Sequence, residues 1–182
     1  MATTRGTWPR YTRRMRIAVG SDHAGFELKA VVAQHLADAG HQVVDFGTGS
    51  PDVSVDYPVF GQAVGEAVSE GRADLGVCVC GTGIGISIAA NKVPGVRAAL
   101  VHDVTTAELA RRHNDANVVC LGGRVTGPAV ALEAVDAFLA APYEGGRHQG
   151  RLDEITRYEQ DRSEAGPHHS APHDTERHVP TR

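Results

Sequence analysis

The sequence has few aromatic residues, few cysteines and no long apolar run. Of its 182 residues only four are Phe, four are Tyr and one is Trp, so the core must be built mainly from aliphatic side chains. The three cysteines form neither an even set nor a repeated spacing, which favours reduced thiols in a cytoplasmic protein over a disulfide framework. No apolar stretch approaches the roughly 20 residues that a membrane span needs.

An excess of positive charge is also missing. The formal net charge is −4 at pH 7, which argues against general binding of nucleic acid or of a membrane surface, because both need a broad basic face. The arginines near the N-terminus are not followed by an apolar run, so they do not form a secretory signal. What is present is ordinary for a globular protein: 41% hydrophobic residues, 22% charged residues and 21 glycines, which indicate many tight turns.

The length favours a single domain, and the composition adds a tail at each end. Residues 1–14 are polar and arginine-rich without periodicity, and we expect a disordered extension there. Residues 161–182 contain three prolines and four histidines, and they bury too little apolar surface to offset their ordering entropy. We therefore expect a disordered tail, with weak metal binding by its histidines as the alternative. The folded domain is predicted over residues 15–160.

Strand-like and helix-like segments alternate through this domain. Five short apolar runs are predicted as strands, at residues 16–20, 42–46, 75–80, 97–101 and 118–121. Segments with helical spacing of apolar residues lie between and after them, at residues 25–39, 58–70, 85–92, 104–113, 128–140 and about 147–160. The alternation predicts an α/β fold in three layers (α/β/α), Rossmann-like, with a five-stranded parallel sheet. In such sheets ligands bind beyond the carboxyl ends of the strands.

The loop after the third predicted strand is the most informative for chemistry. Cys80 ends the strand, and Gly81, Gly83 and Gly85 follow at alternate positions before a helix begins. Glycines let the backbone approach a ligand, and the free N–H groups of a helix start stabilise an anion. A cysteine base beside such donors suits proton abstraction next to a carbonyl group. The alternative, a small buried cysteine that only packs, stays open from position alone.

Two nucleotide motifs fit this loop less well. A P-loop needs Lys and then Ser or Thr after its last glycine, whereas Ile86 and Ser87 follow here. A dinucleotide fingerprint places its third glycine three positions after the second, and here the interval is two. Asp103 stands near the place of a ribose-binding acid, so a dinucleotide-binding module remains the alternative from another class. Cys78 and Cys80 share one face of the strand but lack further ligands at a recognised spacing, so we predict no metal site. Cys78 and Cys120 are predicted to pack in the core.

Polar residues near other strand and helix ends are further candidates. Asp22 and His23 follow the first strand, where such a pair forms either a turn or part of a binding site. His113 closes the helix after the fourth strand, a place where histidine more often caps carbonyls than catalyses.

An anion site is also indicated. Arg147 and Arg151 are four residues apart, which predicts two stacked guanidinium groups on one helix face. With Arg124 they would clamp a phosphate, unless Glu144 and Glu154 neutralise them individually.

Six motifs together resemble one known family. In chain order they are Gly20-Ser-Asp-His-Ala-Gly-Phe26, Asp56-Tyr-Pro58, Cys80-Gly-Thr-Gly-Ile-Gly-Ile-Ser-Ile-Ala-Ala-Asn-Lys92, Arg112-His-Asn-Asp115, Gly122-Gly-Arg-Val125 and Glu144-Gly-Gly-Arg-His-Gln149. The set resembles ribose-5-phosphate isomerase type B, of the sugar-phosphate isomerases that include the galactose-6-phosphate isomerase subunits. The resemblance extends from about Met15 to Asp161.

The resemblance implies an enzyme that interconverts ribose 5-phosphate and ribulose 5-phosphate, in the pentose phosphate pathway, without metal or cofactor. It also implies a homodimer or tetramer whose site draws residues from two subunits. A hexose 6-phosphate such as allose or galactose 6-phosphate remains the alternative substrate, because the sequence does not reveal the length of the pocket.

The resemblance also implies roles for individual residues. Cys80 would move the proton between C1 and C2, and His113, assisted by Thr82, would open the sugar ring. The enediolate oxygen would be held by Asn114 and by the loop amides, among them those of Gly81, Gly83, Ile84 and Gly85. Asp22 would bind sugar hydroxyls and Tyr57 would line the pocket, while the phosphate ligands would be His23, Arg124, Arg147 and Arg151. One family branch has a glutamate base just after the last loop glycine; Ile86 stands there, so this chain resembles the cysteine type.

Overall fold

Five parallel strands form the centre of the computed structural model, which describes residues 14–164. The strands are β1 (Arg16–Ser21), β2 (Gln42–Asp45), β3 (Leu75–Cys80), β4 (Ala98–Leu100) and β5 (Val118–Gly122). Their order in the sheet is β2-β1-β3-β5-β4, and every neighbouring pair is parallel. The central strand β3 therefore has β1 on one side and β5 on the other, and the loops after these three strands lie side by side.

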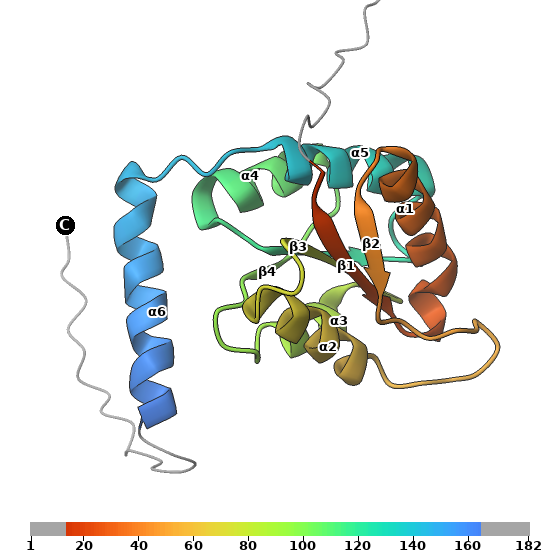
Figure 1. Ribbon diagram of the computed structural model, residues 1–182, viewed down its shortest axis with the longest axis horizontal. Coiled ribbons are helices and arrows are strands. Elements are labelled where there is room, and N and C mark those ends of the chain that lie inside the picture. The colour runs from red at the N-terminus through yellow and green to blue at the C-terminus, as the bar shows by residue number, and fades with distance from the viewer. Residues whose placement is uncertain (1–13, 165–182) are drawn as a thin grey trace, which may run out of the picture.

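Helices cover both faces of this sheet (Figure 1). The helices of the described chain are α1 (Phe26–Asp38), α2 (Tyr57–Ser69), α3 (Ile84–Ala90), α4 (Val104–Asn114), α5 (Pro128–Ala140) and α6 (Gln149–Glu164), with short 3₁₀ turns η1 (His23–Gly25) and η2 (Gly146–His148). The sheet is covered by α1 to α5. The apolar faces of α1, α4 and α5 form one core with the side chains of one sheet face, and α2 and α3 form a second core with the other. The predicted three-layer α/β fold with a five-stranded parallel sheet is confirmed.

Alternation along β3 assigns its residues to the two cores. Val77 and Val79 face the core beneath α1 and α5, whereas Cys78 and Cys80 face the core beneath α2 and α3. All six residues of β3 are buried, as expected for the central strand of a sheet covered on both sides. Cys78 and Cys120 are fully buried neighbours in register across β3 and β5, in agreement with their expected place in the core.

The ends of the predicted elements differ from the observed ones by at most two residues, except at the last helix. The prediction of a disordered tail from residue 161 was wrong for residues 161–164, which continue α6. These residues are compatible with a helix, Ser163 Oγ donates to the carbonyl oxygen of Glu159 (2.9 Å), and the first proline comes only at Pro167. The rest of both predicted tails, residues 1–13 and 165–182, lies outside the described residues.

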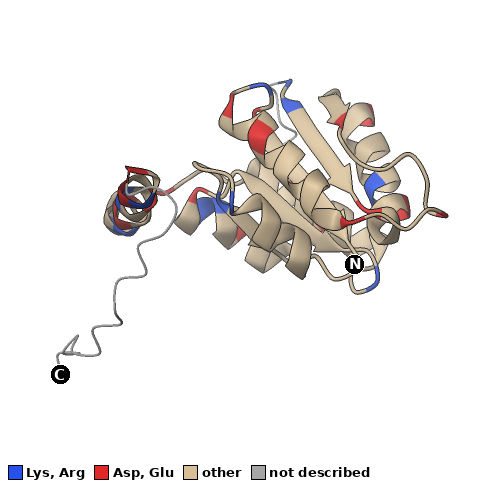
Figure 2. Cartoon of the chain, turned by 90° about the horizontal axis from the view of Figure 1, so that it is seen from below, with Lys and Arg blue, Asp and Glu red and all other residues tan. Residues whose placement is uncertain are grey.

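Helix α6 stands apart from the layered body of the chain (Figure 1). It carries both acidic and basic residues, and elsewhere Lys and Arg are spread over several elements (Figure 2). Within residues 14–164, no helix combines the length and the apolar character that crossing a membrane requires.

Candidate functional site

The loops after β1, β3 and β5 meet at the carboxyl edge of the sheet. Gly123 N–H donates to the carbonyl oxygen of Cys80 (2.8 Å), and Arg124 N–H donates to that of Gly81 (3.0 Å). The turn η1 after β1 packs directly on β3, where a methyl group added to Gly25 would lie 2.5 Å from the carbonyl oxygen of Val79. The polar residues that follow the three strands therefore share one edge.

Cys80 is the last residue of β3 and is 4% exposed. Its Sγ accepts a hydrogen bond from the backbone N–H of Gly83 (3.2 Å), a contact that stabilises negative charge on the sulfur. Gly83 has a φ of +78°, in the left-handed region, and this conformation turns the chain from β3 into α3. A glycine is needed here for two reasons, since a side chain would be strained and would also meet the backbone of Leu121.

Tyr57 and Thr82 complete the surroundings of the loop. Tyr57 opens α2, and its ring packs on Gly85 so closely that an added methyl group would lie 2.5 Å from Cζ. Thr82 Oγ1 accepts from the N–H of Ile84 (3.3 Å), so the hydroxyl group caps the start of α3. Ile84 itself is 52% exposed, and its side chain points away from the core.

Asp22, just before η1, and His23, the first residue of η1, lie at the same carboxyl edge of the sheet. Asp22 is buried, and its Oδ1 accepts from the N–H of Gly25 (2.9 Å), so the expected turn is present. His23 Nδ1 lies 3.2 Å from both the backbone nitrogen and the carbonyl oxygen of Val55. These contacts hold the ring through Nδ1 and leave Nε2 for a ligand. The guanidinium of Arg124 lies over Gly81, with Nη1 3.5 Å from the position of an added methyl group. We call Asp22, His23, Tyr57, Cys80, Thr82 and Arg124 the carboxyl-edge cluster.

His113 and Asn114 lie elsewhere in the same chain. Helix α4 begins after the carboxyl end of β4 and runs back along the sheet for 11 residues, about 16 Å. Its last residues are consequently at the amino edge of the sheet, where Arg97, just before β4, donates to the carbonyl oxygen of Asn114 (2.9 Å). Cys80 and His113 thus sit at opposite edges of one sheet, and one chain alone does not bring them together.

The segment after α5 packs on the end of α4. Glu144 N–H donates to the carbonyl oxygen of Arg112 (3.0 Å), and the ring of His148 stacks on that of His113 with centroids 4.3 Å apart and planes 10° apart. Arg147 lies in η2 and Arg151 lies in α6. The two arginines were expected on one face of a single helix, but they belong to two successive elements. We call the group Arg112, His113, Asn114, Glu144, Arg147, His148 and Arg151 the amino-edge cluster.

Glu144 lies at the centre of this cluster. Its Oε1 accepts from Arg112 Nε (2.6 Å) and also contacts Nη2 of the same residue. Its Oε2 lies 3.7 Å from His113 Nε2 and 3.8 Å from His148 Nε2. Hydrogen bonding to Arg112 holds the pKa of the Glu144 carboxyl below its ordinary value. Glu144 was an alternative acid for the pair Arg147 and Arg151, but in the structure it is paired with Arg112.

The surroundings of His148 favour a neutral ring. Burial lowers the pKa of His148, and the positive charges of His113, Arg147 and Arg151 lower it further. The sequence predicts no role for His148, and for Glu144 only the neutralisation of an arginine, although both lie within the motif from Glu144 to Gln149. Their contacts join segments more than 30 residues apart, so no local pattern points to them.

Metal binding is one chemistry that this cluster must be tested for. One ligand atom each from His113, Glu144 and His148 lie within 4.8 Å of one another. The lone pairs of imidazole nitrogens lie in the ring planes, and two nearly parallel planes do not meet at one ion. Arg112 already occupies one oxygen of the carboxylate, Oε1. The observed arrangement fits a carboxylate placed between a guanidinium and two imidazoles better than a metal ligand set.

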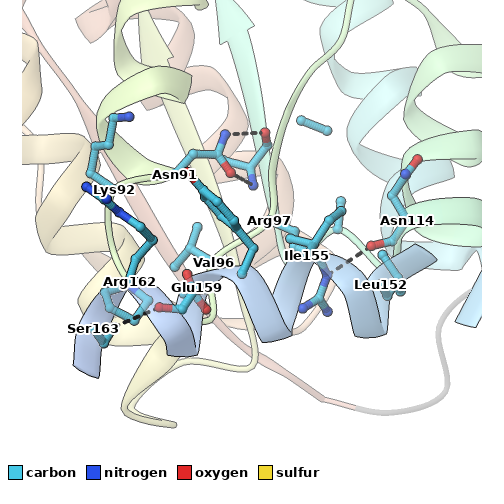
Figure 3. Close-up of a pocket in the computed structure, with 15 residues that line it drawn as sticks. Asn91, Lys92, Val96, Arg97, Asn114, Leu152, Ile155, Glu159, Arg162 and Ser163 are labelled. Carbon is cyan, nitrogen blue, oxygen red and sulfur yellow. Dashed lines mark hydrogen bonds between the residues drawn. The ribbon is translucent and has the colours of Figure 1, made fainter. Parts of the chain in front are cut away.

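A groove of about 940 Å³ separates α6 from the segment around β4 (Figure 3). Val96, Leu152 and Ile155 give it an apolar lining, and Asn114 lies at one end of it. No residue of the carboxyl-edge cluster lines this groove. It adjoins the amino edge of the sheet, on the side where α6 projects.

Comparisons with known proteins show which proteins this chain is similar to. Residues 17–155 match the protein family described as Ribose/Galactose Isomerase. The chain is 49% identical over 148 residues to ribose-5-phosphate isomerase B of Escherichia coli (strain K12), a match that covers 81% of this chain and 99% of that protein.

Two solved structures extend the similarity to the fold. Ribose-5-phosphate isomerase B of Clostridium thermocellum has a TM-score of 0.80 and 50% identity, covering 81% of this chain and 99% of that chain. Ribose-5-phosphate isomerase B of Mycoplasma genitalium, solved with bound ribulose-5-phosphate, has a TM-score of 0.77 and 46% identity, covering 80% and 97%.

Proposed function

The chain belongs to the Ribose/Galactose Isomerase family, and from this premise we propose that it is a type B ribose-5-phosphate isomerase. The reaction interconverts ribose 5-phosphate and ribulose 5-phosphate, a step of the pentose phosphate pathway. The observation that carries the proposal is the thiol of Cys80 at the carboxyl edge of the sheet, 3.2 Å from the Gly83 N–H that faces it. The three cysteines of the chain are free and buried, which fits a cytoplasmic enzyme.

The proposed reaction begins with the opening of the sugar ring by His113, assisted by Thr82. The Cys80 thiolate then takes the proton from C2 of the open aldose and returns it to C1, while the proton of the O2 hydroxyl passes to O1, so that the aldose becomes a ketose. Between the two transfers the substrate is an enediolate, whose oxygen is held by Asn114 and by the backbone amides of the loop from Gly81 to Gly85. Donors that are in place before the charge develops stabilise it without reorganisation, and this is how the loop lowers the barrier.

The rest of the substrate is held at two places. Asp22 binds sugar hydroxyls, and Tyr57 lines the pocket beside Gly85. His23 and Arg124 bind the phosphate from the carboxyl-edge cluster, and Arg147 and Arg151 bind it from the amino-edge cluster. Binding of the remote phosphate positions C1 and C2 against the sulfur, so interactions far from the reacting carbons contribute to the rate.

These assignments require a second copy of the chain. Cys80 and His113 lie at opposite edges of one sheet, so we infer that the amino-edge cluster of one subunit completes the carboxyl-edge cluster of another. Ile155 and Tyr158 on the projecting α6 are 55% and 70% exposed, which supports burial of that helix against a partner. A homodimer is the smallest assembly that meets this requirement, and a tetramer built from two such dimers meets it equally.

The substitution Cys80→Ala tests this function. We expect it to lower kcat for ribose 5-phosphate by at least about 10²-fold, the usual contribution of a general base, while the substrate still binds. Cys78→Ala is the matched control, because Cys78 is buried on the same face of the same strand two residues away. Formation of ribulose 5-phosphate in a coupled assay measures both. Turnover by Cys80→Ala close to that of Cys78→Ala would reject Cys80 as the base.

The same assay with a panel of aldose phosphates tests the substrate. We expect ribose 5-phosphate to be preferred, and a higher kcat/KM for allose 6-phosphate or galactose 6-phosphate would assign the chain to the hexose phosphates.

A further inference from the structure

Glu144 has no role in the reaction as described, yet it contacts more members of the amino-edge cluster than any other acidic residue of the described chain. We propose that Glu144 is the positioning residue of His113: its carboxylate holds the imidazole in place and stabilises the protonated ring that opens the sugar. This rests on the proposed function, in which His113 is the ring-opening acid.

The position of the carboxylate is determined by Arg112. The Glu144 N–H donates to the carbonyl oxygen of Arg112 (3.0 Å), which attaches the backbone of this segment to the last turn of α4. The Arg112 guanidinium then binds Oε1 through Nε and Nη2. Since both contacts use Oε1, the other oxygen, Oε2, is left to face the imidazoles.

The His113 ring is held from two directions. Oε2 attracts its Nε2 from 3.7 Å, a distance that becomes a hydrogen bond after a movement of less than about 1 Å. The stacked ring of His148 covers one face of His113, and this contact restricts rotation of the imidazole about its Cβ–Cγ bond. Together the two contacts select both the place and the plane of the ring.

Glu144 also supplies a negative charge beside the His113 ring. The other groups placed against this ring are His148 from η2, which stacks on it, and Arg112 beside it on α4, which binds Glu144. A carboxylate therefore lies at the point where a proton must be delivered.

Glu108 makes a matched control possible. It also binds Arg112, through Nη1 (2.7 Å), but from one helical turn earlier on α4. Glu108→Gln removes one ion pair of Arg112, whereas Glu144→Gln removes an ion pair of Arg112 together with the contact to the imidazoles. The difference between the two variants isolates the effect on His113.

We expect Glu144→Gln to lower kcat for ribose 5-phosphate by about tenfold with KM within about twofold, because loss of positioning costs less than the 10²–10⁴-fold of losing an acid. Glu108→Gln should retain the kcat and the KM of the parent enzyme. Glu144→Asp, which keeps the charge, should recover most of the lost kcat, and it carries the test if Glu144→Gln folds poorly.

A double-mutant cycle separates this proposal from the proposed function. In a His113→Asn background, Glu144→Gln should cause no further loss of kcat, because its effect passes through His113. Equal losses in both backgrounds, or an equal loss in Glu108→Gln, would overturn the role of Glu144. An active Cys80→Ala enzyme would instead overturn the assignment of the base, and the coupling between Glu144 and His113 would still be measurable.

Discussion

The substitution Gly83→Ala tests whether the turn from β3 into α3 needs a glycine for its conformation, for space, or for both. Gly83 has a φ of +78°, which costs a residue with a side chain about 1–2 kcal/mol. An added methyl group would also lie 2.5 Å from Leu100 Cδ1 and 2.8 Å from the backbone carbon of Leu121. Leu121 belongs to the buried strand β5 and cannot move freely, so overpacking adds about 1–3 kcal/mol.

Gly95 is a matched control for this prediction. Its φ is also +78°, but a methyl group added there would meet only Ser69 Oγ, at 3.5 Å. Gly95→Ala therefore has the backbone strain without the clash. We expect the free energy of unfolding to fall by about 1–2 kcal/mol in Gly95→Ala and by about 2–5 kcal/mol in Gly83→Ala. Urea denaturation at one fixed protein concentration measures both, since assembly affects the stability of each.

Activity gives the second half of the test. A shift of Gly83 moves the N–H that faces Cys80 Sγ. The same amide is among those proposed to hold the enediolate oxygen, and removal of one oxyanion donor costs about 10²–10³-fold in kcat. Gly95→Ala should retain the kcat of the parent enzyme. Equal stability of the two variants would refute the steric argument, and a fully active Gly83→Ala would refute the role of this amide.

Three further predictions concern assembly, pH and a buried cation. Mixing Cys80→Ala with His113→Asn subunits should restore up to about a quarter of the parent activity, because half of the dimers are mixed and each has one intact site of two; no recovery would place both residues in one chain. The folded-state pKa of His148 is depressed, so the unfolded chain binds more protons, and the free energy of unfolding should fall as pH drops through the unfolded value of 6.5. His148→Gln should flatten this dependence in urea titrations between about pH 7.5 and 5.5, and an unchanged slope would contradict it. Lys29→Met should lower the free energy of unfolding by about 1–3 kcal/mol in the same urea assay, because the buried ammonium donates to Asp45 (2.7 Å) and to the carbonyl oxygen of Thr48 (3.2 Å). An unchanged free energy of unfolding would contradict a structural role of Lys29.

Local patterns were sufficient for most elements of this fold. The strand Leu75–Cys80 and the helix Pro128–Ala140 have the predicted bounds, since an apolar run ending in glycines and a proline at a first helical turn are local signals. The error at residues 161–164 came from judging the tail by its average composition, whereas a helix continues until its own residues stop it. Helix termination depends on the next few residues, and here the prolines come later.

The candidate residues themselves were proposed from the sequence, because the motifs that contain them are contiguous: Cys80 with its glycine loop, and His113 within Arg112–Asp115. Only the tertiary structure decided how these motifs are grouped. The parallel order of the strands and the return of α4 place His113 at the edge opposite Cys80, and they bring Glu144 and His148 to it from more than 30 residues away. Chemical identity is a property of single side chains, but proximity results from the packing of the whole chain, and no local pattern encodes it.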